Sequence, residues 1–95
     1  MLGEGLRLIR VFHDCKVGEL AVALDLSASY ISEVENGKKT PSINTLRKYA
    51  DYFETTVSAI MFFSEDIEKD KKIPVKSAVR KKLVRFLQII ENETV

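Results

Sequence analysis

Two short segments with a helical spacing of apolar residues follow each other almost without a gap in the first half of the chain. They span residues 17–24 and 28–35. Between them, Asp25-Leu26 leaves room only for a very short turn, and Ser27 is a favourable N-cap for the second segment. The sequence therefore predicts two short helices joined by a tight turn. Their inward-facing residues are Val17, Leu20, Ala21 and Leu24 in the first helix and Ile31 and Val34 in the second.

Three further helices are predicted around this pair, at residues 2–13, 43–53 and 57–63. Gly37 ends the preceding helix, because glycine readily adopts the left-handed conformation of helix ends, and Ser42 and Thr56 are predicted N-caps. No segment has a convincing strand pattern, so the predicted fold class is all-α. The predicted core comprises Leu20, Leu24, Leu26, Ile31, Val34, Leu46, Ala50, Phe53, Val57 and Ile60, and the inner stripes add Leu2, Leu6, Ile9, Phe12, Ile43 and Met61.

The last third of the chain has a different pattern. Residues 64–74 are mostly charged and are predicted to be a solvated linker, and Pro74 precedes a final amphipathic helix within residues 75–95. The apolar side chains of this helix alternate steps of four and three residues, the spacing of a coiled coil. They are Val79, Leu83, Phe86 and Ile90. We expect this stripe to form a homodimer, with packing on the chain's own domain as the alternative.

The composition limits the class of protein. The 95 residues suit one domain with an appended helix, and 45% hydrophobic with 31% charged residues is a normal globular balance. No apolar run is long enough to cross a membrane, and the N-terminus lacks a signal-peptide pattern. The only cysteine, Cys15, has no partner for a disulfide within the chain. A cytoplasmic protein, associated with the nucleoid when bound to DNA, is the expectation.

The net charge of +1 conceals an uneven distribution. Residues 1–66 contain seven Lys/Arg against ten Asp/Glu, a net charge of −3, whereas residues 67–95 contain eight against four, a net charge of +4. The predicted helical domain therefore has no general basic field, and any contact with nucleic acid there requires a local cluster of cations and backbone N–H groups. The basic residues of the final helix are expected to form its solvated face, with a second DNA-facing patch as the alternative.

The stretch from Glu19 to Ser42 resembles the Xre/Cro-cI family of phage and bacterial regulators. The typical family run is E-L-A, a short turn, S-x-x-Y-I-S-x-I-E-N-G, two basic residues and x-P-S. The matching residues are Glu19, Leu20, Ala21, Ser27, Tyr30, Ile31, Ser32, Glu35, Asn36, Gly37, Lys38, Pro41 and Ser42. The resemblance covers about residues 2–63 and implies a five-helix, phage-repressor-like helix-turn-helix domain at residues 1–63, whose second helix enters the DNA major groove.

Three sets of functional residues follow from this resemblance. The base-facing residues would be Ala28, Ser29, Ser32 and Glu33, and the phosphate-contacting residues would be Lys16, Tyr30, Asn36, Lys38, Lys39 and Thr40. Arg10 and Glu35 would form a structural ion pair beneath the DNA-facing surface. The base-facing set lacks the Arg, Gln or Asn that makes bidentate contacts to bases, so DNA shape is expected to contribute to recognition.

The sequence departs from the family pattern at two places. Lys16 and Val17 stand where most members have a Ser/Thr cap and a Gln, which leaves the cap of the helix at 17–24 without its usual side chain. Glu54 stands where Gly is common, which affects the local turn.

The predicted function is a sequence-specific DNA-binding transcriptional regulator, a repressor acting as a homodimer on a palindromic operator of double-stranded DNA. The main alternative is an antitoxin or antirepressor-type adaptor whose main partner is a protein. An enzyme is not expected, because His13, Asp14 and Cys15 lie at a helix end without a predicted pocket and fall short of a metal site. Neither a metal nor a cofactor is expected.

Overall fold

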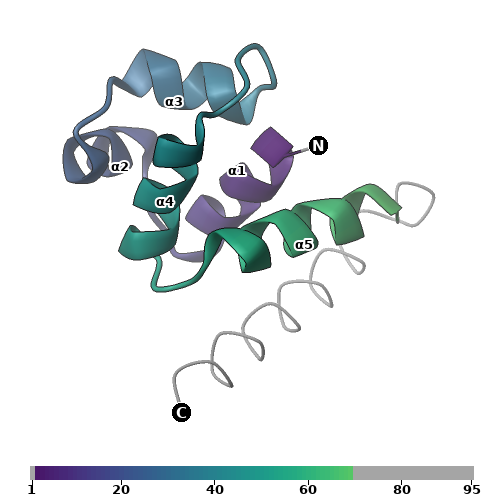
Figure 1. Ribbon diagram of the computed structural model, residues 1–95. Coiled ribbons are helices and arrows are strands. Elements are labelled where there is room, and N and C mark those ends of the chain that lie inside the picture. The colour runs from purple at the N-terminus through teal and green to yellow at the C-terminus, as the bar shows by residue number, and fades with distance from the viewer. Residues whose placement is uncertain (1, 70–95) are drawn as a thin grey trace.

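The structure is a computed structural model that describes residues 2–69, and within this range it consists of five helices and no strand. The helices are α1 (Leu2–Phe12), α2 (Val17–Leu24), α3 (Ala28–Glu35), α4 (Ile43–Tyr52) and α5 (Val57–Lys69). Figure 1 shows α3 at one end of the domain, with α4 and α1 between it and α5. The all-helical prediction is confirmed, and the predicted bounds of the second and third helices agree with the structure.

The core lies where all five helices meet. The residues predicted for it are buried, apart from Leu26 and Val57, which are partly buried and pack against it. Ile43 and Met61 are wrong as core residues, because they are 58% and 42% exposed. The buried face of α4 is centred on Leu46 and Tyr49, which places Ile43 at its edge. Phe12 is also 42% exposed, since it is the last residue of α1.

Helix α5 is longer than the sequence pattern predicted. It was expected to end at residue 63 and to give way to a linker at residue 64, but it continues to Lys69. Phe63, Ser64 and Ile67 are buried and extend the inner face begun by Ile60. The sequence pattern did not reveal this stripe, because the charged residues Glu65 and Glu68 occupy the exposed face between the buried positions. Residues 70–74 of the predicted linker and the predicted helix within residues 75–95 lie outside the described residues.

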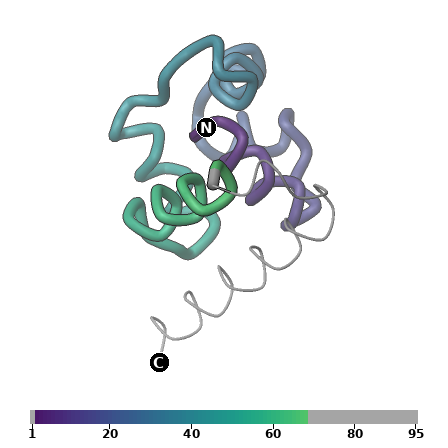
Figure 2. The backbone as a smooth tube through the Cα atoms, turned by 90° about the vertical axis from the view of Figure 1, so that its right-hand side faces the viewer, coloured from purple at the N-terminus to yellow at the C-terminus, as the bar shows by residue number. Residues whose placement is uncertain are grey.

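Helix α1 packs closely against two other helices, and the views in Figures 1 and 2 both place α1 beside α5. Gly3 and Gly5 allow this approach. A Cβ at Gly3 would overlap the backbone carbonyl oxygen of Val34 near the end of α3, and a Cβ at Gly5 would overlap the Ser64 hydroxyl in α5. The glycines of α1 therefore set the distances from α1 to α3 and α5.

The predicted caps are present. The side-chain oxygens of Ser27, Ser42 and Thr56 accept hydrogen bonds from backbone N–H groups three residues later, at 3.0–3.1 Å. Gly37, with a φ of 79°, ends α3 in the left-handed conformation as predicted. At the start of α2, the Lys16 side chain makes no capping bond, as the departure from the family pattern implies.

The turn after α4 contains a strained residue that is open to a test. Glu54 has a φ of 55°, and the Thr55 N–H donates to the Ala50 carbonyl at 2.8 Å across it, an arrangement that glycine usually occupies. A non-glycine residue in this conformation costs about 1–2 kcal/mol. We expect Glu54→Gly to raise the free energy of unfolding by about 0.5–1 kcal/mol, measured by urea denaturation. In the control Glu65→Gly, on the exposed face of helix α5, the same change should cost about 1 kcal/mol.

None of the helices described between residues 2 and 69 is long and apolar enough to cross a lipid bilayer.

Candidate nucleic-acid interface

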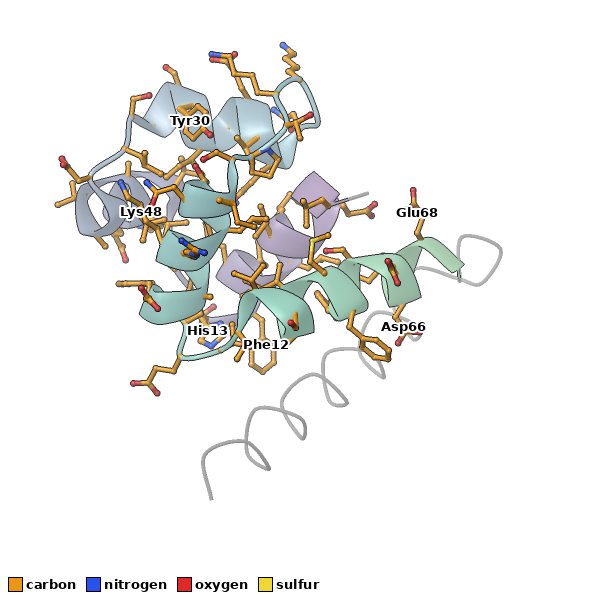
Figure 3. The ribbon with its side chains drawn as sticks, in the orientation of Figure 1. Phe12, His13, Tyr30, Lys48, Asp66 and Glu68 are labelled. Carbon is orange, nitrogen blue, oxygen red and sulfur yellow. The ribbon has the colours of Figure 1, made fainter. Side chains whose placement is uncertain are left out.

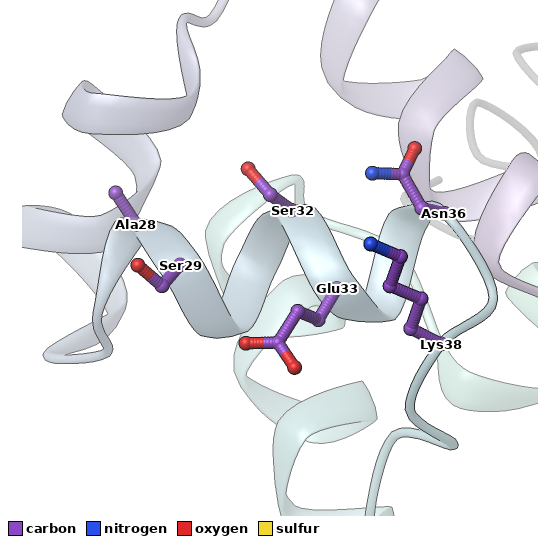
Figure 4. Close-up of a pocket in the computed structure, with 6 residues that line it drawn as sticks. All are labelled: Ala28, Ser29, Ser32, Glu33, Asn36 and Lys38. Carbon is purple, nitrogen blue, oxygen red and sulfur yellow. The ribbon is translucent and has the colours of Figure 1, made fainter.

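One face of α3 is buried and the opposite face is open to solvent. Ile31, Val34 and Glu35 point into the domain, where α3 packs on α1 and α2. The open face and the loop after it line a shallow surface hollow of about 510 Å³. The residues that line the hollow are Ala28, Ser29, Ser32, Glu33, Asn36 and Lys38 (Figure 4). The structure thus brings the four residues predicted to face bases together with two of those predicted to contact phosphates.

The side chains that line this hollow are mostly polar, and none of them is an arginine or a glutamine. Ser29 and Ser32 each offer a hydroxyl that donates or accepts, Asn36 offers an amide, and Glu33 offers a carboxylate that only accepts hydrogen bonds. Lys38 supplies a positive charge, and its side chain reaches back along α3 from the loop (Figure 4). The hollow therefore combines hydrogen-bonding groups in its middle with a cation at its edge.

Tyr30 lies beside this hollow but does not line it. Its hydroxyl and the hydroxyl of Thr45 in α4 share a hydrogen bond of 3.0 Å, and Thr45 also contacts the Ser42 hydroxyl at 3.0 Å. Thr45 is buried, and the Tyr30 side chain packs against the core. This chain of hydroxyl groups ties α3 to the first turn of α4, which is a structural task that the sequence pattern did not predict for Tyr30 (Figure 3).

The remaining residues predicted to contact phosphates are exposed. Thr40 lies in the loop after α3, and Lys16 lies at the start of α2. Lys39 is exposed as well, but its ammonium lies 3.4 Å from the Glu33 carboxylate and 5.9 Å from the centre of the Tyr30 ring. The structure thus pairs Lys39 with a residue that was predicted to face a base.

Arg10 and Glu35 form the ion pair that the resemblance implies. The Arg10 Nε donates to both Glu35 carboxylate oxygens at 3.0 Å, and an Arg10 terminal nitrogen lies 3.0 Å from Glu35 Oε1. The other terminal nitrogen donates to the Cys15 carbonyl at 2.8 Å. Only 13% of the Arg10 side chain and 4% of the Glu35 side chain are exposed. The pair therefore joins α1 to the end of α3 and to the loop before α2.

Tyr49 is a third member of this network that the sequence pattern did not predict. Its hydroxyl donates to Glu35 Oε2 at 3.0 Å, and its side chain is fully buried. Burial raises the pKa of Tyr49, with a further contribution from the negative charge of Glu35, so the hydroxyl stays protonated and remains a donor. The hydrogen bond to Glu35 likewise raises the pKa of Arg10. Tyr49 lies on the buried face of α4, beside Ala50. Its position on the apolar stripe of this helix is the sequence signal that could have predicted its burial.

His13 and Cys15, considered above as chemical groups, both make structural contacts, although His13 is exposed and Cys15 is buried. The His13 ring lies 4.8 Å from the Phe53 ring and 5.4 Å from the Phe12 ring, and its Nδ1 is 2.8 Å from the Ile9 carbonyl (Figure 3). Cys15 is buried, and burial raises the pKa of its thiol, which disfavours the thiolate. Residues 2–69 contain no group of three or more His, Cys, Asp or Glu side chains placed to hold a metal ion.

Comparison with known families gives a match. The family described as helix-turn-helix, of the Xre/Cro-cI type, matches residues 6–60, which is more than half of the chain and includes α2, α3 and the hollow. Comparison with curated proteins and with solved structures gives no match.

Proposed function

Because the chain belongs to the Xre/Cro-cI type of helix-turn-helix family, we propose that it is a sequence-specific transcriptional repressor that binds a palindromic operator as a homodimer. The family match supports a DNA-binding regulator in general. The observation that carries the proposal further is the hollow at α3, because it gathers four hydrogen-bonding side chains and Lys38 from the open face of α3 and the loop after it. An α-helix fits into the major groove of B-DNA, where base edges present their hydrogen-bonding groups.

The hydrogen-bonding groups of this face suit different parts of DNA. Ser29 and Ser32 can make single hydrogen bonds to base edges, Ala28 can contact a thymine methyl group, and Glu33 can accept from a cytosine amino group. Asn36 and Lys38 line the hollow beside this set, and they would contact phosphates together with Thr40 in the same loop and Lys16 at the start of α2. Tyr30 would act indirectly, by holding α3 against α4 through Thr45.

The test is selection of DNA fragments from a random pool by the purified chain, followed by sequencing and measurement of affinity. A palindromic sequence bound much more tightly than random DNA is the expected result. Binding that is equal for all sequences would overturn the proposed specificity, and no binding at low salt would overturn the proposed function.

The contribution of Lys38 can be measured on the selected operator. We expect Lys38→Ala to weaken binding about equally on operator and random DNA, because a phosphate contact carries no sequence information. It should also reduce the slope of log K against log salt by about 0.9 for each phosphate that the variant no longer neutralises. Arg47→Ala, on the exposed face of α4, is the control and should leave the slope nearly unchanged if that face lies away from DNA. An unchanged slope in Lys38→Ala would contradict its role as a phosphate contact.

The homodimer would be formed by the apolar stripe of residues 75–95, which comprises Val79, Leu83, Phe86 and Ile90. Two subunits would place their α3 helices about one helical turn of DNA apart, about 34–36 Å. We expect a chain truncated after residue 74 to be monomeric by analytical ultracentrifugation and to bind the operator more weakly. It keeps all the described residues of the core, so its circular dichroism should remain helical. A truncated chain that is still dimeric would contradict this role of the final segment.

A protein partner is the second candidate function. Large apolar side chains are exposed at the end of α1 and on α5, among them Phe12 at 42% and Phe62 at 50%, and residues 1–66 have a net charge of −3. Exposed apolar surface of this kind suits a protein interface. Co-purification of a stoichiometric protein that is lost in Phe62→Ser would support this function, and such a partner is compatible with DNA binding.

A further inference from the structure

Glu33 is an acidic side chain on the face of α3 that is proposed to meet DNA. Its carboxylate lines the hollow, and about a third of the side chain is exposed. A carboxylate close to the phosphate backbone weakens binding by repulsion unless a cation neutralises it. The proposed interface therefore needs a cationic side chain that pairs with the Glu33 carboxylate.

Lys39 meets this need through three separate contacts. Its ammonium lies 3.4 Å from Glu33 Oε2 and 5.9 Å from the centre of the Tyr30 ring. Its backbone N–H donates to the Glu33 carbonyl at 3.2 Å, next to the 2.8 Å bond from the Lys38 N–H to the same oxygen. The backbone bonds fix where the chain turns back after α3, so the Lys39 side chain starts close to Glu33. The backbone at the end of α3 therefore places the two residues of the pair close together, although their charged groups are exposed.

Lys38 and Lys39 are neighbours in the sequence but differ in their surroundings. Lys38 lines the hollow and forms no ion pair with the residues that the structure describes, whereas Lys39 faces Glu33 and Tyr30. A cation already paired with a carboxylate adds little net attraction for a phosphate. A free cation adds its full charge. The two lysines should therefore affect DNA binding in different ways.

We propose that Lys39 is a positioning residue that neutralises and orients the Glu33 carboxylate within the DNA interface, while Lys38 is the phosphate contact of this loop. This inference rests on the proposed function. Held by Lys39, Glu33 can accept a hydrogen bond from a base amino group without adding net negative charge near the phosphates. Without Lys39, the same carboxylate becomes an uncompensated charge at the interface, and binding becomes weaker.

A double-mutant cycle on the selected operator tests this pairing. Lys39→Ala in the wild-type background should weaken binding by about tenfold, because the charge of Glu33 is then uncompensated beside DNA. In a Glu33→Ala background, which has no carboxylate to position, Lys39→Ala should leave the preference for the operator over random DNA unchanged, whereas in the wild-type background it should reduce that preference. Lys39→Arg keeps the charge and should restore most of the affinity.

Lys38→Ala is the matched comparison, because it removes the same side chain one residue away. Its effect should be equal in both backgrounds and equal on operator and random DNA, and it should lower the salt slope by about 0.9 for each phosphate left without its cation. A loss of affinity from Lys39→Ala that is equal on operator and random DNA in both backgrounds would make Lys39 a phosphate contact and overturn the inference while the proposed function stands. A wild-type chain that selects no DNA would overturn both.

Discussion

Replacing Glu35 with alanine is expected to lower the free energy of unfolding by about 3–5 kcal/mol. The Arg10 guanidinium is nearly buried and donates to both oxygens of this carboxylate, so it would keep its charge and lose its partner. The Tyr49 hydroxyl would lose its acceptor in the same step. Unfolding by urea, followed by circular dichroism, measures the change.

Glu33→Ala is the matched control for this substitution. Both glutamates belong to α3, but Glu33 is on the exposed face, so its loss should change the free energy of unfolding by no more than about 0.5 kcal/mol. If Glu35→Ala does not fold, Tyr49→Phe provides a milder test, with an expected loss of about 1–2 kcal/mol from one hydrogen bond. Losses below about 1 kcal/mol in Glu35→Ala would contradict a structural role for the ion pair.

The Glu35 network also bears on DNA binding, because Glu35 is the last residue of α3 and Asn36 follows it. Arg10 holds this end of the helix from α1, and Tyr49 holds it from α4. Asn36 and Lys38 line the hollow directly after this anchored residue. A network that fixes the end of α3 thus also fixes the loop that carries the proposed phosphate contact.

The local parts of this fold could be predicted from the sequence. Ser27 and Gly37 mark the start and end of α3 through backbone chemistry that acts within a few residues, and both predictions are confirmed. The continuation of α5 to Lys69 depends instead on a distant partner, since Ser64 packs opposite Gly5 in α1. Periodicity alone cannot show which helix lies across from a charged stretch, and the prediction of a linker was wrong at residues 64–69 for that reason.

The candidate site divides in the same way. The side chains on the open face of α3 follow from helical periodicity, and the resemblance implied the ion pair of Arg10 with Glu35. The third member, Tyr49, depends on how close α4 brings it to the end of α3, and the pairing of Lys39 with Glu33 depends on how the chain turns back after Gly37. Both contacts arise from tertiary geometry, which the spacing of residues in a sequence does not contain.

Gly3→Ala is expected to lower the free energy of unfolding by about 2–3 kcal/mol, less than Glu35→Ala. The added Cβ would overlap the Val34 carbonyl oxygen and lie 3.0 Å from the Glu35 carbonyl oxygen, and neither backbone atom can move away by a change of rotamer. Helix α1 must then shift away from the end of α3, which stretches the Arg10–Glu35 pair. Urea denaturation measures the loss in stability.

Gly18→Ala is the control that separates this clash from the general effect of replacing a helical glycine. A Cβ at Gly18 would meet no atom within 4 Å, so alanine should stabilise α2 by up to about 1 kcal/mol. The same change is therefore expected to have opposite signs in the two helices. A stabilising effect at Gly3 as well would show that α1 and α3 are farther apart than the structure places them. The pair of variants thus tests the helix contact on which the anchored end of α3 depends.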